Sequence, residues 1–391
     1  MKTAIYGGSF NPPHLGHADA AMAVYEELSP DRFFIIPDNV PPHKKLAEGS
    51  PDGESRLELC RLNFAGIPGA EVLDIELLRE GKSYTADTVE QILGQYPGDE
   101  LYLVLGTDML LSFEHWYKFG YLVENCTLCV LARDDEDFEA VRSHAEYMRS
   151  EYGAKVLVLH HEPLPMSSSD VREKLVMRMG EDMLDDKVYS EIIRKGYYDA
   201  LPSLSWLREK AFGYVSEDRI GHVAGCESEA VMLAMHWGED PETAATAGIL
   251  HDITKKLKYE EQLILCDKYG IICDNAELEN PRLLHAVTGA AMARELFGVS
   301  DGVYEAIRWH TTGKADMSRL EEIIYLADYI EPTRDFEGLE KLRELAYEDL
   351  DEAMRLALEM CLEEVRSRGT EPHKNSVDAY HWYCNKKEAT E

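Results

Sequence analysis

The sequence predicts two domains of different class, an α/β domain over residues 1–200 and an all-α domain over residues 201–391. The first half alternates short apolar runs with helical stretches, which is the pattern of βαβ units and of a parallel sheet with helices on both faces. After Leu204 the segments keep helical periodicity and strand-like runs almost vanish. A proline and two serines in DALPSLSW mark this change of period, so we place the domain boundary near residue 200.

The elements of the first domain are predicted from short runs of one periodicity. Six apolar runs rich in β-branched and aromatic residues are expected to be buried strands: 3–6, 32–36, 72–74, 101–105, 127–131 and 155–159. Between them, apolar residues at helical spacing predict helices over 18–28, 55–64, 85–95 and 169–179. The helical segments of the second domain include ETAATAGILHDITKKL, LLHAVTGAAMARELFG, RLEEIIYLADYI and DEAMRLALEMCLEEVRSRG.

Composition and charge limit the functions that the chain can have. Its 391 residues are 45% hydrophobic and 29% charged, the balance of a globular protein with two or three domains rather than of a disordered chain or a disulfide scaffold. The net charge is −34, with −17 in each of the two halves. Such a surface repels nucleic acid, so we expect no role in coating DNA or RNA. Small phosphorylated ligands remain compatible with it, because local groups hold them.

Cysteine usage and hydropathy predict a cytoplasmic protein. The eight cysteines are scattered, and the close pair Cys126 and Cys129 lies in an apolar run that predicts a strand, so we interpret them as buried thiols of a reducing compartment. The first residues lack the apolar stretch of a secretory signal, and no apolar run approaches the roughly 18 residues that span a bilayer. We therefore expect no membrane and no nucleic-acid partner, and self-association into a homo-oligomer stays open.

The first candidate site follows the first predicted strand, in GGSFNPPHLGH. Gly7 and Gly8 allow a tight turn and close approach of the backbone to a ligand. His14 and His17 bracket Gly16 at the start of the next helix, where unpaired N–H groups and the helix dipole favour an anion. The motif predicts a phosphate site. The alternative is a proline-shaped loop that carries two surface imidazoles.

A second segment, PMSSSDVREKL, has the residues of a phosphate-binding helix start. Ser167, Ser168, Ser169 and Asp170 precede an amphipathic run and are expected to cap a helix, exposing N–H groups and hydroxyls to phosphate oxygens. Arg172 would lie in the first turn, where a guanidinium binds phosphate through two hydrogen bonds. The alternative is an ordinary capped helix with a solvated arginine. Together with the histidine pair, this segment predicts the opposite wall of a triphosphate site.

These two motifs resemble those of the nucleotidyltransferase superfamily and, more narrowly, of bacterial nicotinate-nucleotide adenylyltransferases, the NadD type. Further matching stretches are PPHK at 41–44, SYTADT at 83–88, GTDML at 106–110, HWYKF at 115–119 and Arg133 at a strand end. Met166 and Ser169 replace the usual isoleucine and threonine and keep the apolar anchor and the hydroxyl. The resemblance covers about residues 1–197. It implies a Rossmann-like nucleotidyltransferase fold, a parallel sheet with helices on both faces.

The resemblance also implies a reaction of NAD biosynthesis. AMP would pass from ATP, bound with Mg²⁺, to the 5′-phosphate of nicotinate mononucleotide, giving deamido-NAD and pyrophosphate. The nucleophile is already an anion, so catalysis reduces to positioning and charge stabilisation. His14 and His17 would contact the ATP phosphates, and Arg172, Ser168 and Ser169 would hold the leaving phosphates.

The remaining substrate positions also follow from the resemblance. Asp108 would bind the adenosine ribose and Lys44 would lie near the mononucleotide phosphate. Thr85, Trp116 and Tyr117 would frame the pyridine ring. Trp116 and Tyr117 could instead be core aromatics, and Lys44 a solvated loop charge. The other implied substrate-binding residues are Gly7, Gly8, Ser9, Phe10, Gly106 and Arg133.

The helical half contains a second candidate site, made of six histidine and aspartate positions in or at the ends of helical segments: His222, His251, Asp252, His285, His310 and Asp328. Buried charged groups require partners or metals, so a His-Asp pair that closes an apolar helix favours a functional site. Imidazoles and carboxylates without thiolates suit two divalent metals of the iron, manganese or zinc kind, with a carboxylate as bridge. Lys255, one turn after the His-Asp pair, would neutralise a phosphate or, alternatively, be an ordinary solvated lysine.

This pattern resembles the HD-domain phosphohydrolases, specifically their YqeK-type branch, over about residues 203–388. The matching stretches are RIGHVAG, ILHDITK, HAVTGA, RWHTTG and LADYIEPTRDF. The resemblance implies a dimetal site, with iron as the expected metal, that cuts diadenosine tetraphosphate symmetrically into two ADP. Arg334 and Asp335 would contact the substrate or brace the site. By motif position, one metal would take His222, His251, Asp252 and Asp328 and the other Asp252, His285 and His310, with Asp252 as the bridge.

The sequence thus predicts a bifunctional enzyme, an adenylyltransferase followed by a metal-dependent phosphohydrolase. Two alternatives stay open. The HD half could act on other nucleotides or serve as a regulatory nucleotide sensor, and the transferase could use another phosphorylated acceptor. The choice of nicotinate over nicotinamide follows from the resemblance alone.

Overall fold

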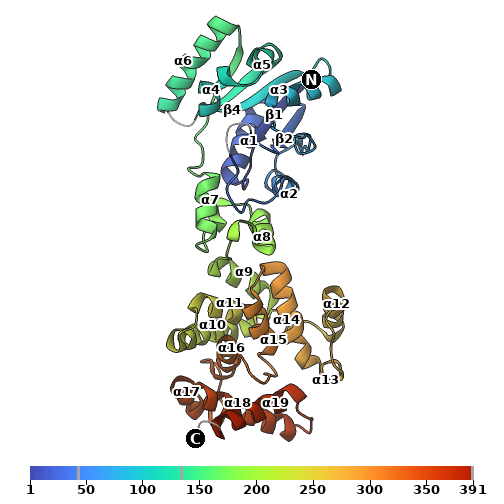
Figure 1. The fold of residues 1–391 in the computed structure, drawn as a ribbon, viewed down its shortest axis with the longest axis vertical. Coiled ribbons are helices and arrows are strands. Elements are labelled where there is room, and N and C mark those ends of the chain that lie inside the picture. Colours follow the sequence, from blue (N-terminus) through green and yellow to red (C-terminus); the bar gives the residue numbers. More distant parts are fainter. Residues whose placement is uncertain (42–44, 133–134, 389–391) are drawn as a thin grey trace. The chain divides into compact units, whose positions relative to one another are not determined.

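The structure is a computed structural model and describes residues 1–41, 45–132 and 135–388. The chain divides into two compact units, Met1–Leu201 and Pro202–Glu391 (Figure 1). The first unit is α/β and the second is helical, so the fold class predicted from the sequence is confirmed. Within the described residues, no helix is both long and apolar enough to cross a membrane.

The first unit is built on a six-stranded parallel sheet with the strand order β3-β2-β1-β4-β5-β6. The strands are β1 (Lys2–Gly8), β2 (Arg32–Pro37), β3 (Ala70–Val72), β4 (Glu100–Gly106), β5 (Cys126–Ala132) and β6 (Lys155–His160). This is the doubly wound order, which reverses direction between β1 and β4. Ligands of such sheets bind at the carboxyl ends of the strands beside that switch point.

Helices cover both faces of this sheet, and each face has its own apolar core (Figure 1). Cys126 and Cys129 lie within β5 as buried core thiols, as predicted. The interpretation of all eight cysteines as buried is wrong for three, since Cys273, Cys361 and Cys384 are half-buried. The helices are α1 (Leu15–Leu28), α2 (Gly53–Asn63), α3 (Thr85–Gln95), α4 (Thr107–Leu111), α5 (Phe119–Asn125), α6 (Asp135–Tyr152), α7 (Ser168–Leu175) and α8 (Asp186–Lys195).

Four of these helices, α4, α5, α6 and α8, are not among the four that the sequence analysis predicts, and α7 is shorter than predicted. α6 was not predicted, because its sequence is dominated by charged residues and its buried stripe is only Val141, Ala145 and Met148 at helical spacing. α7 ends at Leu175 rather than at residue 179, because Arg178 and Gly180 adopt positive φ angles of 56° and 94° that no α-helix accommodates.

The second unit consists of helices, with no strand among its described residues. These are α9 (Leu204–Tyr214), α10 (Glu217–Trp237), α11 (Pro241–Leu250), α12 (Tyr259–Tyr269), α13 (Asn275–Glu279), α14 (Pro281–Phe297), α15 (Asp301–Trp309), α16 (Arg319–Ile330), α17 (Leu339–Glu348), α18 (Leu350–Ser367) and α19 (Lys374–Glu388). α10 and α11 pack so closely that a Cβ on Gly248 would lie 2.9 Å from the Cα of Glu227. Glycine at this position therefore brings the His222 and His251 helices together.

Candidate functional sites

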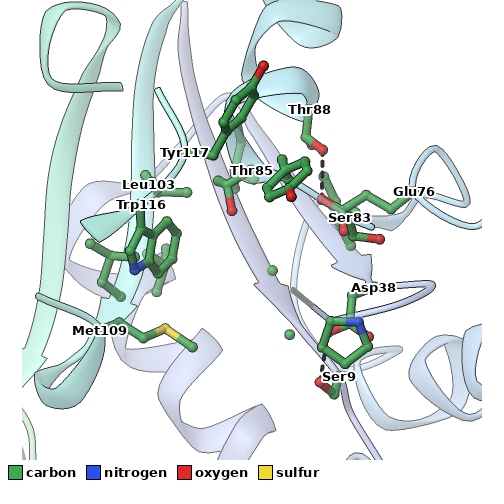
Figure 2. A pocket seen from close by; sticks show the side chains of 18 of the residues that line it. Ser9, Asp38, Glu76, Ser83, Thr85, Thr88, Leu103, Met109, Trp116 and Tyr117 are labelled. Carbon is green, nitrogen blue, oxygen red and sulfur yellow. Dashed lines mark hydrogen bonds between the residues drawn. The ribbon is translucent and has the colours of Figure 1, made fainter. Parts of the chain in front are cut away.

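The first unit contains a cavity of about 340 Å³ at the carboxyl ends of β1, β2 and β4, where the doubly wound topology places a ligand (Figure 2). Gly7, Gly8 and Ser9 line it from the end of β1. A Cβ on Gly8 would lie only 3.1 Å from the buried ring of Phe10, so a side chain there would displace that ring. Phe10 thus supports the loop from within the core and does not itself line this cavity.

The two histidines of the first motif lie together at the start of α1. His14 is the N-cap of α1, and its backbone N–H donates to Nδ1 of His17 at 3.2 Å. The ring centroids are 3.7 Å apart. Because its Nδ1 accepts, His17 in its neutral form carries its proton on Nε2 and can donate it to an anion. Burial lowers the pKa of His14 to about 4, so this imidazole is neutral at physiological pH.

The start of α7, predicted as the second part of the phosphate site, is hydrogen-bonded to the loop that precedes the histidine pair. A guanidinium Nη1 of Arg172 donates to the carbonyl oxygen of Asn11 at 2.5 Å, and the hydroxyl of Ser168 donates to the carbonyl oxygen of Pro12 at 2.9 Å. Arg172 Nη2 also donates to the hydroxyl of Ser169 at 3.1 Å. The start of α7 is therefore held against the loop that carries the histidine pair, and Arg172 is not an isolated solvated arginine.

The aromatic residues predicted for the acceptor line the same cavity (Figure 2). Tyr117 is 48% exposed and its ring lies 4.6 Å from that of Tyr84, so it is not a core aromatic. Trp116 is half-buried and also packs on Phe113, with centroids 5.2 Å apart. Figure 2 places Trp116 across the cavity from Glu76. Trp116 thus packs against the core and also lines the cavity.

Two helix starts open on this cavity. Thr85 is the first residue of α3, and its N-cap Tyr84 makes no side-chain capping bond, so the first N–H groups remain available to an anion. Asp108 lies exposed in the first turn of α4, after Gly106 as N-cap, and lines the cavity. The predicted substrate residues Lys44 and Arg133 lie outside the described residues.

Three charged residues at this site were not predicted from the sequence. Asp38 lines the cavity and accepts a hydrogen bond from the Ser9 hydroxyl at 2.7 Å. Arg56 is 1% exposed and donates to the carbonyl oxygens of Ser9 at 2.8 Å and of Asp38 at 2.6 Å. Glu76 is buried at the cavity wall, where burial raises the pKa of its carboxyl and the Thr88 hydroxyl donates to it at 2.6 Å.

The second unit brings the six predicted metal ligands together in two trios. In each trio, ligand atoms of the three side chains lie within 4.8 Å of one another. The first trio is His222, His251 and Asp328, and the second is Asp252, His285 and His310. The end of α11 supplies one residue to each trio, because His251 of the first trio and Asp252 of the second follow this helix directly.

Asp252 faces both trios, with one carboxylate oxygen toward each. Its Oδ2 lies 3.6 Å from Nε2 of His222 and 3.4 Å from Nε2 of His251. Its Oδ1 lies 3.2 Å from Nε2 of His285 and 3.7 Å from Nε2 of His310. This placement suits a carboxylate that bridges two cations.

The histidine tautomers give independent support for cations at this centre. The Nδ1 atoms of His251, His285 and His310 each donate to a backbone carbonyl oxygen, at 2.7, 2.6 and 2.7 Å. The Nε2 atoms of the neutral rings therefore carry lone pairs. Nε2 of His285 and Nε2 of His310 nevertheless lie 3.1 Å apart. Both lone pairs also face donors, the Lys255 ammonium for His285 and the Thr311 hydroxyl for His310, and nitrogen lone pairs gathered in this way are the ligands that divalent metal ions take from histidines.

Side chains around the trios orient the ligands. Glu331, which was not predicted, is fully buried and accepts from Nδ1 of His222 at 3.0 Å. Arg334 donates to the carboxylate of Asp328 at 2.7 Å and so braces this ligand, whereas Asp335 is exposed. Arg219, also missed, pairs with Asp252.

Lys255 lies against the centre and is not a freely solvated lysine. Its Nζ is 2.9 Å from Nε2 of His285 and 3.6 Å from Oδ1 of Asp252. Burial and this neighbouring ammonium lower the pKa of His285 to about 4, which keeps the ring neutral as a metal ligand must be. A cavity of about 630 Å³ adjoins the centre, with Lys255, His310 and Asp328 in its wall.

Family profiles match a stretch of each unit. A cytidylyltransferase-like family profile matches residues 5–174, and an HD-domain profile matches residues 219–333. A probable nicotinate-nucleotide adenylyltransferase of Carboxydothermus hydrogenoformans is 33% identical over 198 residues, which are 50% of this chain and 98% of the relative. A probable nicotinate-nucleotide adenylyltransferase of Fusobacterium nucleatum is 32% identical over 200 residues, 51% of this chain and 100% of the relative.

A solved structure from Clostridium acetobutylicum, described as a predicted HD superfamily hydrolase involved in NAD metabolism, is 34% identical with a TM-score of 0.46. The match covers 48% of this chain and 100% of that one. The fold and the two sites define a nucleotidyltransferase domain followed by an HD domain. The chain belongs to the nicotinate-nucleotide adenylyltransferase family.

Proposed function

We propose that the chain is a bifunctional enzyme. Its first unit transfers AMP from ATP to nicotinate mononucleotide, giving deamido-NAD and pyrophosphate. Its second unit hydrolyses diadenosine tetraphosphate symmetrically to two ADP. The relatives named as nicotinate-nucleotide adenylyltransferases support the first activity, and the six-residue metal centre supports the second.

The observation that carries the transferase proposal is the contact between the α7 start and the histidine loop. Arg172, Ser168 and His17 come from segments more than 150 residues apart, and direct hydrogen bonds hold these segments together. Together the two segments would offer a guanidinium, a hydroxyl and an imidazole N–H to a triphosphate bound beside them. Mg²⁺ bound with ATP would add positive charge on the phosphates.

In the transferase reaction, an oxygen of the acceptor phosphate forms a bond to the α-phosphorus of ATP. The bond from that phosphorus to the bridging oxygen of the β-phosphate breaks, and pyrophosphate leaves with its charge. No proton needs to be removed from the nucleophile, so no general base is required. Arg172 and His17 stabilise the charge that moves onto the leaving phosphates.

The acceptor side of the cavity supports an acid rather than an amide on the pyridine ring. The uncapped start of α3 at Thr85 offers backbone N–H groups to a carboxylate, and the helix dipole has the matching sign. The aromatic residues Trp116 and Tyr117 provide the flat surfaces that a pyridine ring packs against.

The observation that carries the hydrolase proposal is the position of Asp252, with one carboxylate oxygen toward each histidine pair. Two divalent metals held by the trios, iron being the expected one, would supply a hydroxide for attack on phosphorus. Lys255 and Arg334 line the adjoining cavity and neutralise the negative charge of a polyphosphate. Tyr329 and Phe336, in the same wall, offer ring faces to a nucleobase.

The test uses the full chain in two reactions. The first contains ATP, Mg²⁺ and either nicotinate or nicotinamide mononucleotide, and the second contains diadenosine tetraphosphate with Fe²⁺ or Mn²⁺. Chromatography of the products is expected to give deamido-NAD in preference to NAD in the first, and ADP alone in the second. Equal rates with both mononucleotides would refute the acceptor, and AMP plus ATP would refute symmetric cleavage. Metal binding without any nucleotide cleavage would favour a regulatory sensor instead.

A further inference from the structure

Two cysteines of the second unit lie in contact outside both proposed centres. The Sγ atoms of Cys266 in α12 and Cys273, four residues after its last residue, are 3.5 Å apart. Both are free thiols. By contrast, Cys126 and Cys129 are close only in sequence, because side chains three residues apart on a strand point to opposite faces.

The local backbone explains why these two thiols meet. Gly270 caps the end of α12, and its left-handed φ of 62° reverses the chain. The N–H of Ile271 then donates to the carbonyl oxygen of Cys266 at 2.8 Å. The reversed segment brings Cys273 back onto Cys266. A small apolar cluster with Leu284 and Val287 of α14 surrounds the pair.

The two thiols differ in accessibility. Cys266 is buried, and burial together with the neighbouring Cys273 raises its pKa to about 12. Cys273 is only half-buried and is the thiol that a small oxidant can reach.

We propose that Cys266 and Cys273 are a redox modification site that closes to an intramolecular disulfide under small disulfide oxidants of the glutathione type. The Cys273 thiolate attacks one sulfur of glutathione disulfide, forming a mixed disulfide and releasing one glutathione thiolate. Cys266 then gives its proton to solvent, and the resulting thiolate attacks the Cys273 sulfur and breaks the mixed disulfide, releasing the second glutathione as a thiolate that takes up a proton. Two protein thiols are oxidised and one glutathione disulfide is reduced to two glutathiones.

Closure shortens the sulfur–sulfur distance from 3.5 Å to about 2.0 Å. That segment is otherwise held by side-chain contacts, from Asp274 to His373 at 3.0 Å and from Glu277 to Arg308 at 3.3 Å. The disulfide would fix it to α12 and pack against Leu284 and Val287, on either side of the metal ligand His285. Oxidation therefore stiffens the layer that covers the His285 helix.

The test equilibrates the reduced full chain with mixtures of glutathione and glutathione disulfide, then alkylates the remaining thiols in acid-quenched samples. Trypsin cuts after Lys258, Lys268 and Arg282, so the disulfide would join the peptide 259–268 to the peptide 269–282. We expect two fewer alkylated thiols per chain, this cross-linked peptide pair, and slower hydrogen exchange over residues 271–280.

The control variants are Cys273→Ser, which removes the attacking thiol, and Cys384→Ser, which removes another half-buried thiol on α19. The cross-link is expected to vanish in C273S and to persist in C384S. A stable glutathione adduct on Cys273, a cross-link to another cysteine, or two fully alkylated thiols in excess oxidant would overturn the proposal. The peptide map of the unsubstituted chain decides this even if C273S does not fold.

Discussion

Glu331 is the residue whose replacement most directly tests how the first metal trio is held. Three donors converge on its buried carboxylate: Nδ1 of His222 at 3.0 Å, the backbone N–H of Thr333 at 2.7 Å and the Thr333 hydroxyl at 2.5 Å. Glu331→Gln keeps the volume but replaces one acceptor oxygen by an NH₂ group. At least one of the three donors then faces another donor, and His222 loses the negative charge that orients its ring.

We expect E331Q to lower the affinity of the first trio for its metal. Removing a hydrogen-bond partner of a metal-bound histidine lowers affinity about 10- to 100-fold, or about 1.4–2.7 kcal/mol. The assay measures metal retained per chain while a chelator lowers the free metal concentration. We expect the E331Q chain to release one metal at about 10- to 100-fold higher free metal than the unsubstituted chain. The other metal, held by the Asp252, His285 and His310 trio, should be released at the unsubstituted concentration.

A matched control separates this effect from the loss of any buried charge. Glu322 is also buried on α16 and accepts a hydrogen bond from the Tyr383 hydroxyl at 2.7 Å, away from the ligands. Glu322→Gln should leave both metal affinities unchanged. If E331Q releases both metals at the same concentrations as the unsubstituted chain, Glu331 does not position the first trio.

Three further predictions concern the transferase unit. Replacing Arg172 by lysine removes its forked hydrogen bonds and should lower kcat/KM for ATP about 10- to 100-fold in steady-state kinetics; an unchanged kcat/KM would exclude a phosphate role. Replacing Arg56 by methionine leaves Asp38 without its buried partner and should lower the free energy of unfolding, measured in urea, by about 3 kcal/mol. As a control, methionine at Arg61, which is 53% exposed, should lower it by under about 0.5 kcal/mol. Equal losses for the two variants would contradict this prediction. Because burial lowers the pKa of His14 from 6.5 to about 4, the unfolded chain binds more protons between these values. Stability should then fall by about 2 kcal/mol from pH 7.5 to 5, and His14→Asn should remove that part of the slope; an unchanged slope would show that His14 is not buried as a neutral ring.

The motifs with local chemistry were predictable from the sequence. The histidine loop, the serine-capped start of α7 and the six candidate metal ligands are short patterns of residue types that suit phosphate or metal binding. The structure brings the members of each set together. Periodicity also predicted the parallel sheet and the helical second unit.

The supporting charges could not be predicted in the same way. Charged side chains are expected at the surface when only the residue type is known, but those of Arg56, Glu76 and Glu331 are buried. Each is hydrogen-bonded to a residue distant in sequence, and this compensates the loss of water. For Glu331 a signal was available, since it follows Asp328 within LADYIEP. Such a carboxylate one turn after a metal ligand can be tested as an outer partner of the histidines.

The measurement that tests the two-centre proposal most directly uses two single variants of the full chain and both reactions. His17→Ala should abolish formation of deamido-NAD and leave the release of ADP from diadenosine tetraphosphate unchanged. Asp252→Asn should abolish the release of ADP and leave deamido-NAD formation unchanged. If either variant loses both activities while remaining folded, or if Asp252→Asn still releases ADP at the unsubstituted rate, the assignment of one reaction to each unit is wrong.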